Sequence, residues 1–256
     1  MIPYFEWRTI DIGPLTVQVW GMWVALGMLL SLFILERRAK RMKMEPQKML
    51  DVSLWMIVSG IIFSRLFVVF FYNPDFYWSH PLEIVKIWQG GLSSFGGLFG
   101  AVVAFFVFAK RKGIPKVNWI KMADLLSFSA LFGWIIGRIG CLFIHDHIGR
   151  PCDCLLAVNF SDGPRLEMAL LEILALLPLG LVFFFSRKKQ KSQGWFTSVL
   201  FIYYGIMRFI LDFFRATDIV GADARYFGLT PGQYSGLLLM GAGLWIWSKN
   251  RHKKVG

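Results

Sequence analysis

Seven stretches of apolar residues divide this chain, and their length limits the folds that are open to it. A helix that crosses the hydrocarbon core of a bilayer needs about 20 mostly apolar residues. Of the 256 residues, 56% are hydrophobic and 17% are charged, which is the composition of a membrane protein. We therefore predict an all-α polytopic membrane protein with about seven transmembrane helices, forming a single domain over residues 1–256. The expected spans are roughly 15–35, 50–71, 92–109, 122–143, 166–186, 195–214 and 232–248.

Lys and Arg residues are unevenly distributed among the loops between these spans. One alternate set of loops holds nineteen of them, and the opposite set holds six. Because positively charged loops tend to stay in the cytoplasm, this asymmetry predicts an N-terminus outside and a C-terminus in the cytoplasm. The same bias accounts for most of the net charge of +12. Since the basic residues are split among four loops, the pattern disfavours nucleic-acid binding.

Several charged residues lie inside the predicted spans, where such side chains are costly and usually functional. Arg65, Arg138 and Arg208 each fall roughly 5 to 7 residues from the outer end of a span, or about 8 to 10 Å into the membrane. Glu172 comes to a similar depth. We expect these groups to meet at one level of the outer leaflet.

The sixth span carries the tightest polar pattern, YYGIMRFILDFFR. Tyr204, Arg208, Asp212 and Arg215 are spaced by four, four and three residues, which places them on one helix face. Asp212 could hold both arginines while they face an anion. Alternatively, Arg208 and Asp212 form a structural pair, and Arg215 extends to the lipid headgroups. The arginines inside three different spans are Arg65, Arg138 and Arg208. Only two carboxylates, Glu172 and Asp212, are available to neutralise them. The remaining positive charge favours a phosphate ligand.

The segment WQGGLSSFGGLFG, residues 88–100, precedes and begins the third span. Its glycines permit close approach of backbone to backbone or to a ligand. The spacing of residues 96 and 100 is also a small-residue packing pattern. Gly96 and Gly97 are therefore candidates both for helix packing and for substrate contact.

The segment CLFIHDHIGRPCDC, residues 141–154, concentrates cysteines, histidines and aspartates on the predicted outer side. Soft metal ligands are present, but Cys152 and Cys154 are too close for a common closed zinc pattern, so no metal is expected. A disulfide is possible on an oxidising side of the membrane. Asp146 or His147, just beyond Arg138, is a candidate proton acceptor. The sequence leaves the state of the cysteines open.

The segment GRIGCLFIHDHIGRP resembles the signature of the prolipoprotein diacylglyceryl transferases. The segments SRLFVVFFYNPDF, WQGGLSSFGGLFGA, YYGIMRFILDFFRATD and GLTPGQYSGLLLMGAG resemble further parts of that family, in the family's order. The resemblance covers nearly the whole chain. It also implies seven spans with an outward N-terminus.

The resemblance implies an enzyme that transfers the diacylglyceryl group of phosphatidylglycerol to the lipobox cysteine of prolipoproteins and releases glycerol 1-phosphate. It implies a monomer in the bacterial inner membrane that contacts membrane lipids, needs no cofactor and opens to the outer leaflet. The candidate catalytic residues are Arg138 and Arg208, which match the family's essential arginines, together with Asp146 and His147. The candidate substrate-binding residues are Arg65, Gly96, Gly97, Gly149, Glu172, Tyr204, Asp212 and Arg215.

Some positions depart from the family pattern. Phe95 stands where the family has its catalytic His, and Cys141 stands where the common signature has Asn. Leu166 and Leu171 replace a His and a Tyr, whereas Glu172 is retained. These departures leave open a paralogue with another acceptor, or a lipid-binding protein without chemistry. A carrier is disfavoured because transporter sites lie near the midplane.

Overall fold

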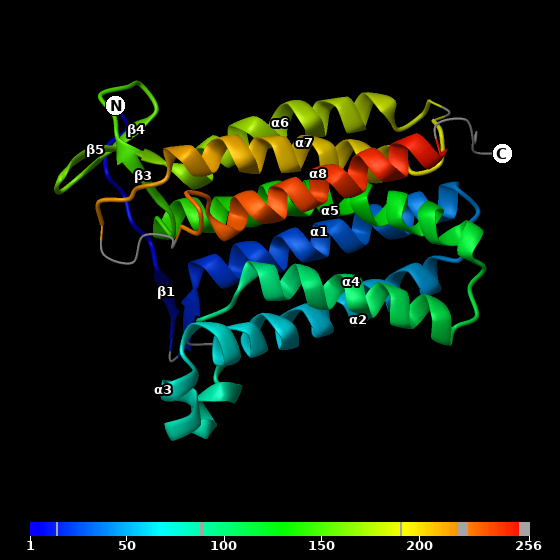
Figure 1. Ribbon diagram of the computed structural model, residues 1–256, viewed down its shortest axis with the longest axis horizontal. Helices are drawn as coiled ribbons and strands as arrows, with labels where there is room; N and C mark the ends of the chain where they lie inside the picture. Colours follow the sequence, from blue (N-terminus) through cyan, green and yellow to red (C-terminus); the bar gives the residue numbers. More distant parts are fainter. Residues whose placement is uncertain (14, 88–89, 190, 220–224, 251–256) are drawn as a thin grey trace. The chain divides into compact units, whose positions relative to one another are not determined.

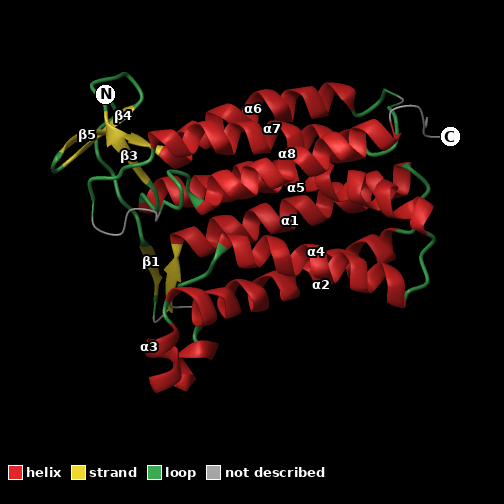
Figure 2. Ribbon diagram, in the orientation of Figure 1, coloured by secondary structure: helices red, strands yellow, loops and turns green. Residues whose placement is uncertain are grey.

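The computed structural model describes residues 1–13, 15–87, 90–189, 191–219 and 225–250. They group into two compact units, one formed by Met1–Ile34 with Ala123–Gly256 and the other by Leu35–Met122. Helices predominate in both units (Figure 1). Figure 2 shows that the strands are few and short. The predicted class of helical polytopic membrane protein is confirmed.

By length and composition, six of the described helices could cross a membrane. They are α1 (Val19–Arg41), α2 (Pro46–Phe67) with the π-helical turn Val68–Tyr72, α4 (Ser94–Arg111), α5 (Lys116–Ile144), α6 (Met168–Ser186), and α7 (Trp195–Leu211) with the 3-10 turn Asp212–Phe214. Helix α8 (Pro231–Asn250) occupies the seventh expected span and has 20 residues, but it lies outside this set. Its sequence is rich in glycine and interrupted by polar residues. The count of seven spans and the orientation therefore stay predictions.

Aromatic and aliphatic side chains of α5, α6 and α7 form the core of the first unit. Phe128 stacks on Phe183 with ring centroids 5.8 Å apart, and Phe183 meets Phe196 edge to face at 5.0 Å. Such ring pairs add to the stabilisation from burial. The other buried members of this cluster are Leu131, Leu176, Leu179 and Met207. The core thus ties together the three helices that carry most of the charged residues discussed below.

A carboxylate of α5 caps the N-terminus of α7. Asp124 accepts hydrogen bonds from the backbone N–H groups of Gly194, at 2.6 Å, and Thr197, at 2.9 Å. The first N–H groups of a helix have no partner within the helix, so a carboxylate at this point satisfies them. The cap anchors the N-terminal end of α7, and Arg208 lies near the C-terminal end of the same helix.

Helices α7 and α8 lie side by side in the first unit (Figure 1). A Cβ atom at Gly205 would lie 2.5 Å from the carbonyl oxygen of Gly236, and one at Gly236 would lie 2.8 Å from the carbonyl oxygen of Gly205. Only glycine fits such a backbone approach. The contact brings the beginning of α8 beside the end of α7.

The first unit also contains short strands that the sequence did not lead us to expect. Strands β1 (Thr9–Ile12) and β2 (Leu15–Gln18) form an antiparallel ribbon. Strands β3 (Ile148–Pro151), β4 (Ala157–Phe160) and β5 (Gly163–Glu167) form an antiparallel sheet in the order β3-β5-β4. Strands of four or five residues leave almost no periodic pattern, and Gly163, with a φ of +118°, makes the tight β4–β5 connection possible.

The second unit packs α4 against α2 and carries the short helix α3 (Pro74–Ser79) and the 3-10 turn Pro81–Val85. A Cβ atom at Gly96 would lie 2.6 Å from the carbonyl oxygen of Phe63, and one at Gly100 would lie 2.6 Å from that of Ser59. The glycine spacing in this segment therefore serves close helix packing.

Candidate active site

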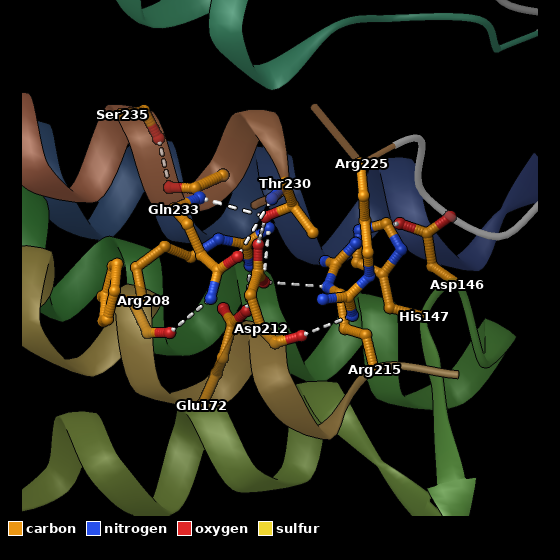
Figure 3. A network of polar contacts seen from close by, with 12 residues as sticks. Asp146, His147, Glu172, Arg208, Asp212, Arg215, Arg225, Thr230, Gln233 and Ser235 are labelled. Atoms are coloured by element: carbon orange, nitrogen blue, oxygen red, sulfur yellow. Dashed lines mark hydrogen bonds and ion pairs between the residues drawn. The ribbon is translucent and has the colours of Figure 1, made fainter. Parts of the chain in front are cut away.

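Asp212 lies between two arginines at the end of α7. Its Oδ1 atom is 3.2 Å from an Nη2 nitrogen of Arg208 and 3.0 Å from Nε of Arg215. The carboxylate is only 1% exposed. The 3-10 turn Asp212–Phe214 continues α7. The spacings of four and three residues therefore place Arg208, Asp212 and Arg215 on one face of this continued helix (Figure 3).

Glu172 of α6 joins the arginines of two other helices. Its Oε2 atom lies 2.6 Å from Nε of Arg138 on α5, and its Oε1 atom accepts a hydrogen bond of 2.7 Å from Arg208 on α7. The Glu172 side chain is 1% exposed. A buried carboxylate is stable in such a place when it is paired and hydrogen-bonded. Glu172 therefore holds two guanidinium groups close together.

The resulting arginine cluster, defined as Arg138, Glu172, Arg208, Asp212 and Arg215, carries more positive than negative charge. Three guanidinium groups face two carboxylates. The side chains of Arg138 and Arg208 are each 14% exposed, so neither is fully enclosed. Planar guanidinium groups bind phosphate through paired N–H donors. The cluster has the chemistry of a site for a phosphate monoanion.

Asp146 and His147 lie in the short segment between α5 and β3, next to this cluster (Figure 3). Nε2 of His147 lies 3.4 Å from Oδ2 of Asp146, and the two side chains are 35% and 45% exposed. Burial lowers the pKa of His147, and the positive charge of Arg215 lowers it further. His147 is therefore neutral near pH 7 and can accept a proton. A neutral imidazole between a cationic cluster and solvent suits a general base.

Gly149 brings strand β3 against the segment that follows α7. Gly149 and Arg215 form an isolated antiparallel β-bridge through their backbones. A Cβ atom at Gly149 would lie 2.7 Å from Cβ of Leu166 and 3.0 Å from the carbonyl oxygen of Phe214. Any larger residue would separate the two segments. Gly149 thus acts through the backbone, by keeping the 146–149 segment close to Arg215.

The cysteine-rich segment contains one disulfide and one thiol. Cys152 is bonded to Cys154, and Cys141 is free and buried. The Sγ atom of Cys141 lies 3.6 Å from an Nη1 nitrogen of Arg138. In the described part of the chain, no three His, Cys, Asp or Glu side chains come together in a way that could hold a metal ion.

His145 forms a buried pair with Glu167 that the sequence did not reveal. Its Nδ1 atom lies 2.7 Å from Oε2 of Glu167, and its Nε2 atom contacts the carbonyl oxygen of Phe5. Burial opposes protonation, but these two acceptors prevail and raise the pKa of His145. Glu167 also accepts a hydrogen bond from the backbone N–H of Ala169, at the start of α6. The pair links the N-terminal segment to the helix that carries Glu172.

Arg65, in the second unit, donates its hydrogen bonds to backbone carbonyl groups of its own unit. Its side chain is buried, and the acceptors are the carbonyl oxygens of Glu83 at 2.6 Å, Gly90 at 2.8 Å, Gly91 at 2.9 Å, Ile84 at 3.0 Å and Lys86 at 3.4 Å. Through these contacts the guanidinium holds residues 83–86 next to residues 90–91. Residues 88 and 89 of the glycine-rich motif lie outside the described residues.

The two glycines proposed as substrate contacts also belong to the second unit. Gly96 packs on Phe63 of α2, and a Cβ atom at Gly97 would lie 3.8 Å from Cβ of Ser64. Phe95 is 42% exposed and packs against the ring of Phe67. A substrate contact through Arg65, Gly96 or Gly97 stays a prediction.

Comparison with known proteins identifies the family. The family model for prolipoprotein diacylglyceryl transferase matches residues 8–249. This chain belongs to the prolipoprotein diacylglyceryl transferase family. The match extends over both compact units, and it confirms the resemblance seen in the sequence motifs.

Curated relatives carry the name phosphatidylglycerol–prolipoprotein diacylglyceryl transferase. The protein of Nitrosomonas europaea is 34% identical over 253 residues, which cover 94% of this chain and 88% of the relative. The protein of Methylocella silvestris is 34% identical over 259 residues, which cover 94% of this chain and 92% of the relative. The protein of Ruegeria pomeroyi is 33% identical over 230 residues, which cover 79% of this chain and 77% of the relative.

The structure adds two residues to the site that the sequence motifs did not indicate. Thr230 and Gln233, at the start of α8, are buried beside Asp212 and Phe209. Their spacing, a Thr followed three residues later by a Gln, is the signature of a helix N-terminal capping box. That signal was available in GLTPGQYSG, but its closeness to Asp212 was not.

Proposed function

We propose that this protein transfers the diacylglyceryl group of phosphatidylglycerol to the lipobox cysteine thiol of prolipoproteins, with release of glycerol 1-phosphate. The family membership and the names of the relatives support this activity. The observation that carries it is the arginine cluster, whose excess positive charge suits the single negative charge of the phosphodiester.

In this proposal, Arg138 and Arg208 bind the phosphate, and Glu172 holds the two guanidinium groups at the right separation. The acceptor thiol gives its proton to a ring nitrogen of His147. The thiolate attacks the carbon of the diacylglyceryl group that is bonded to the phosphate oxygen, and a carbon–sulfur bond forms. The carbon–oxygen bond breaks, and its electron pair stays on the phosphate of the departing glycerol 1-phosphate. The charge that develops there is stabilised by preorganised guanidinium donors.

We assign the role of general base to His147, with Asp146 beside it. The family's catalytic His has no counterpart at Phe95, so this chain needs another proton acceptor. His147 combines a lowered pKa with a partly exposed side chain next to Arg215. The nearby cations also favour the thiolate over the thiol.

We further propose that the enzyme works as a monomer in the bacterial cytoplasmic membrane and opens to the outer leaflet. The charge asymmetry of the loops supports this orientation, since the loop that carries Asp146 and His147 belongs to the set poor in Lys and Arg. The partners would be phosphatidylglycerol, surrounding membrane lipids and the lipobox segment of prolipoproteins.

A transfer assay tests the proposal. Purified protein in phosphatidylglycerol vesicles is given a synthetic lipobox peptide, and mass spectrometry reads whether the cysteine gains a diacylglyceryl group. We expect Arg208→Ala to abolish both transfer and phosphatidylglycerol binding, and Asp146→Asn to slow transfer while binding remains. Arg187→Ala, on the basic α6–α7 loop, serves as the control for loss of a positive charge. Near-normal activity in both site variants would overturn the assigned roles.

A further inference from the structure

The first turn of α8 is closed by two side chains that hydrogen-bond to each other's backbone. Oγ1 of Thr230 accepts a hydrogen bond of 3.1 Å from the N–H of Gln233, and Oε1 of Gln233 accepts one of 2.9 Å from the N–H of Thr230. This is the reciprocal capping box of a helix N-terminus. Thr230 is 1% exposed and Gln233 is 0% exposed. The box is therefore rigid and shielded from water.

Both side chains also bind α7 and the turn that follows it. The amide nitrogen of Gln233 donates a hydrogen bond of 3.1 Å to the carbonyl oxygen of Phe209. The hydroxyl of Thr230 donates its single proton to Oδ2 of Asp212 (Figure 3). A helix cap needs only the acceptor capacity of the hydroxyl, so its proton is available for a second partner. In this protein that partner is a carboxylate of the arginine cluster.

Gly232 allows this turn of α8 to lie directly against the cluster. A Cβ atom on Gly232 would be 2.3 Å from Oδ2 of Asp212 and 2.9 Å from Nε and Nη2 of Arg208. Backbone N–H groups at a helix N-terminus carry partial positive charge, which attracts a nearby carboxylate. The start of α8 thus both approaches Asp212 and favours its negative charge.

The two oxygens of Asp212 have different partners. Oδ2 accepts from Thr230, whereas Oδ1 faces Arg208 and Arg215. Fixing Oδ2 fixes the rotation of the whole carboxylate, because its atoms are coplanar. The orientation of Oδ1 then sets where the two guanidinium groups lie.

We propose that Thr230, held in place by Gln233, is a positioning residue for the transfer reaction. Its hydroxyl orients Asp212 so that Arg208 and Arg215 are preorganised for the phosphate of the lipid. The inference rests on the proposed function, and it adds a role for α8 in lipid binding. Thr230 acts through Asp212 and does not itself contact the substrate.

The first test compares three single variants in the transfer assay. Thr230→Val keeps the shape of the side chain but removes the hydroxyl, and we expect kcat/KM for phosphatidylglycerol to fall about tenfold or more, mainly through KM. Thr230→Ser keeps the hydroxyl and should stay within about threefold of the wild type. Ser235→Ala is the matched control, because its hydroxyl hydrogen-bonds to the carbonyl oxygen of Gly232 and not to the cluster.

A double-mutant cycle separates positioning from general destabilisation. If Thr230 acts through Asp212, the loss caused by Thr230→Val should nearly vanish in an Asp212→Asn background, since interacting residues are not additive. Additive losses would overturn the proposal, and so would wild-type kcat/KM in Thr230→Val. Thermal unfolding in detergent reports whether Thr230→Val folds, and Thr230→Ala replaces it if it does not.

A binding assay with phosphatidylglycerol vesicles tests the positioning role of Thr230 separately from the proposed reaction. If the wild type transfers no lipid to the peptide, the proposed reaction fails, and the same variants are compared by their affinity for phosphatidylglycerol vesicles. Weaker binding in Thr230→Val than in Thr230→Ser supports the positioning role. Equal binding in the two variants overturns it. An active wild type with an unaffected Thr230→Val removes the inference and leaves the proposed function intact.

Discussion

At the scale of single residues, Glu172 is a buried carboxylate that neutralises two arginines at once. It is 1% exposed and pairs with arginines on two different helices. Bringing two guanidinium groups together without an anion between them is unfavourable, because their charges repel in a medium of low dielectric. Glu172 compensates for this repulsion in the absence of substrate, and Asp212 does the same for Arg208 and Arg215.

We predict that Glu172→Gln destabilises the protein and that phosphatidylglycerol partly restores the stability. Removing one partner's charge from a buried pair costs about 3 to 5 kcal/mol. A bound phosphate would return negative charge to Arg138 and Arg208. Thermal unfolding in detergent, with and without phosphatidylglycerol, measures both effects. The control is Glu83→Gln, whose side chain is 26% exposed and pairs with Lys86 near the surface. Equal unfolding temperatures for the two variants would contradict the prediction.

The pH dependence of transfer should report His147. Burial and the charge of Arg215, with smaller contributions from Arg138 and Arg208, lower its pKa, and the carboxylate of Asp146 opposes this by raising it. His147 therefore stays neutral above its usual pKa of about 6.5 and becomes protonated only at lower pH. Since only neutral His147 accepts the thiol proton, the rate should be full above about pH 6.5 and should fall as the pH drops through the lowered pKa.

The measurement is the transfer rate against pH for the wild type and for His147→Gln. We expect the acid limb to disappear in the variant, together with most of the rate. An acid limb that survives in His147→Gln, or one centred well above pH 7 in the wild type, would show that another group takes the proton.

At the scale of secondary-structure elements, glycines set how closely the helices pack. In the first unit, a Cβ atom at Gly133 of α5 would lie 2.2 Å from the carbonyl oxygen of Gly27 of α1, and one at Gly27 would lie 2.4 Å from the carbonyl oxygen of Gly133. Helices in membranes gain stability from such close packing, because apolar burial supplies little driving force there. Arg138 stands five residues beyond this contact on α5, so the contact also sets the position of its helix.

We predict that Gly133→Ala separates α1 from α5 and lowers the stability by about 1 to 3 kcal/mol, as overpacking does in tight cores. The same substitution at Gly241 of α8, where nothing lies within 4 Å of the added Cβ, should be neutral or slightly stabilising. Unfolding in detergent compares the two variants. A neutral Gly133→Ala would mean that the helices tolerate a wider spacing.

At the scale of the whole molecule, orientation in the membrane decides which substrate pool the cluster meets. The basic residues between α6 and α7 are expected in the cytoplasm, and the β4–β5 turn is expected outside. A lipid-modifying site that faces outward would receive prolipoproteins after translocation. The predicted orientation, if the labelling experiment below supports it, would therefore place transfer after translocation of the prolipoprotein.

Cysteine labelling tests this topology. A membrane-impermeant maleimide should label Ser161→Cys in intact spheroplasts and Ser192→Cys only in inside-out vesicles. Both are made in a Cys152→Ser, Cys154→Ser background, and the buried Cys141 serves as the internal unlabelled thiol. The opposite pattern would reverse the predicted orientation.

The sequence alone determined the class of the protein, its family and the positions of the six described helices that are long and apolar enough to cross a membrane. Each of these depends on residues that are close in the chain: a run of about 20 apolar residues, a motif of fifteen, or a four-residue spacing that repeats on one helix face. The common face of Arg208, Asp212 and Arg215 is of this kind, and the structure shows the ion pairs between them.

Only the tertiary structure decided which charges meet and which residues support them. Glu172 and Arg208 are 36 residues apart in sequence, and Thr230 and Asp212 are 18 apart, so no local pattern relates them. Arg65 resembles the other intramembrane arginines in sequence, yet it binds the carbonyl groups of a nearby loop. The physical reason is that hydrogen bonds and ion pairs between elements depend on the packing of helix faces, and that packing is a property of the folded chain as a whole.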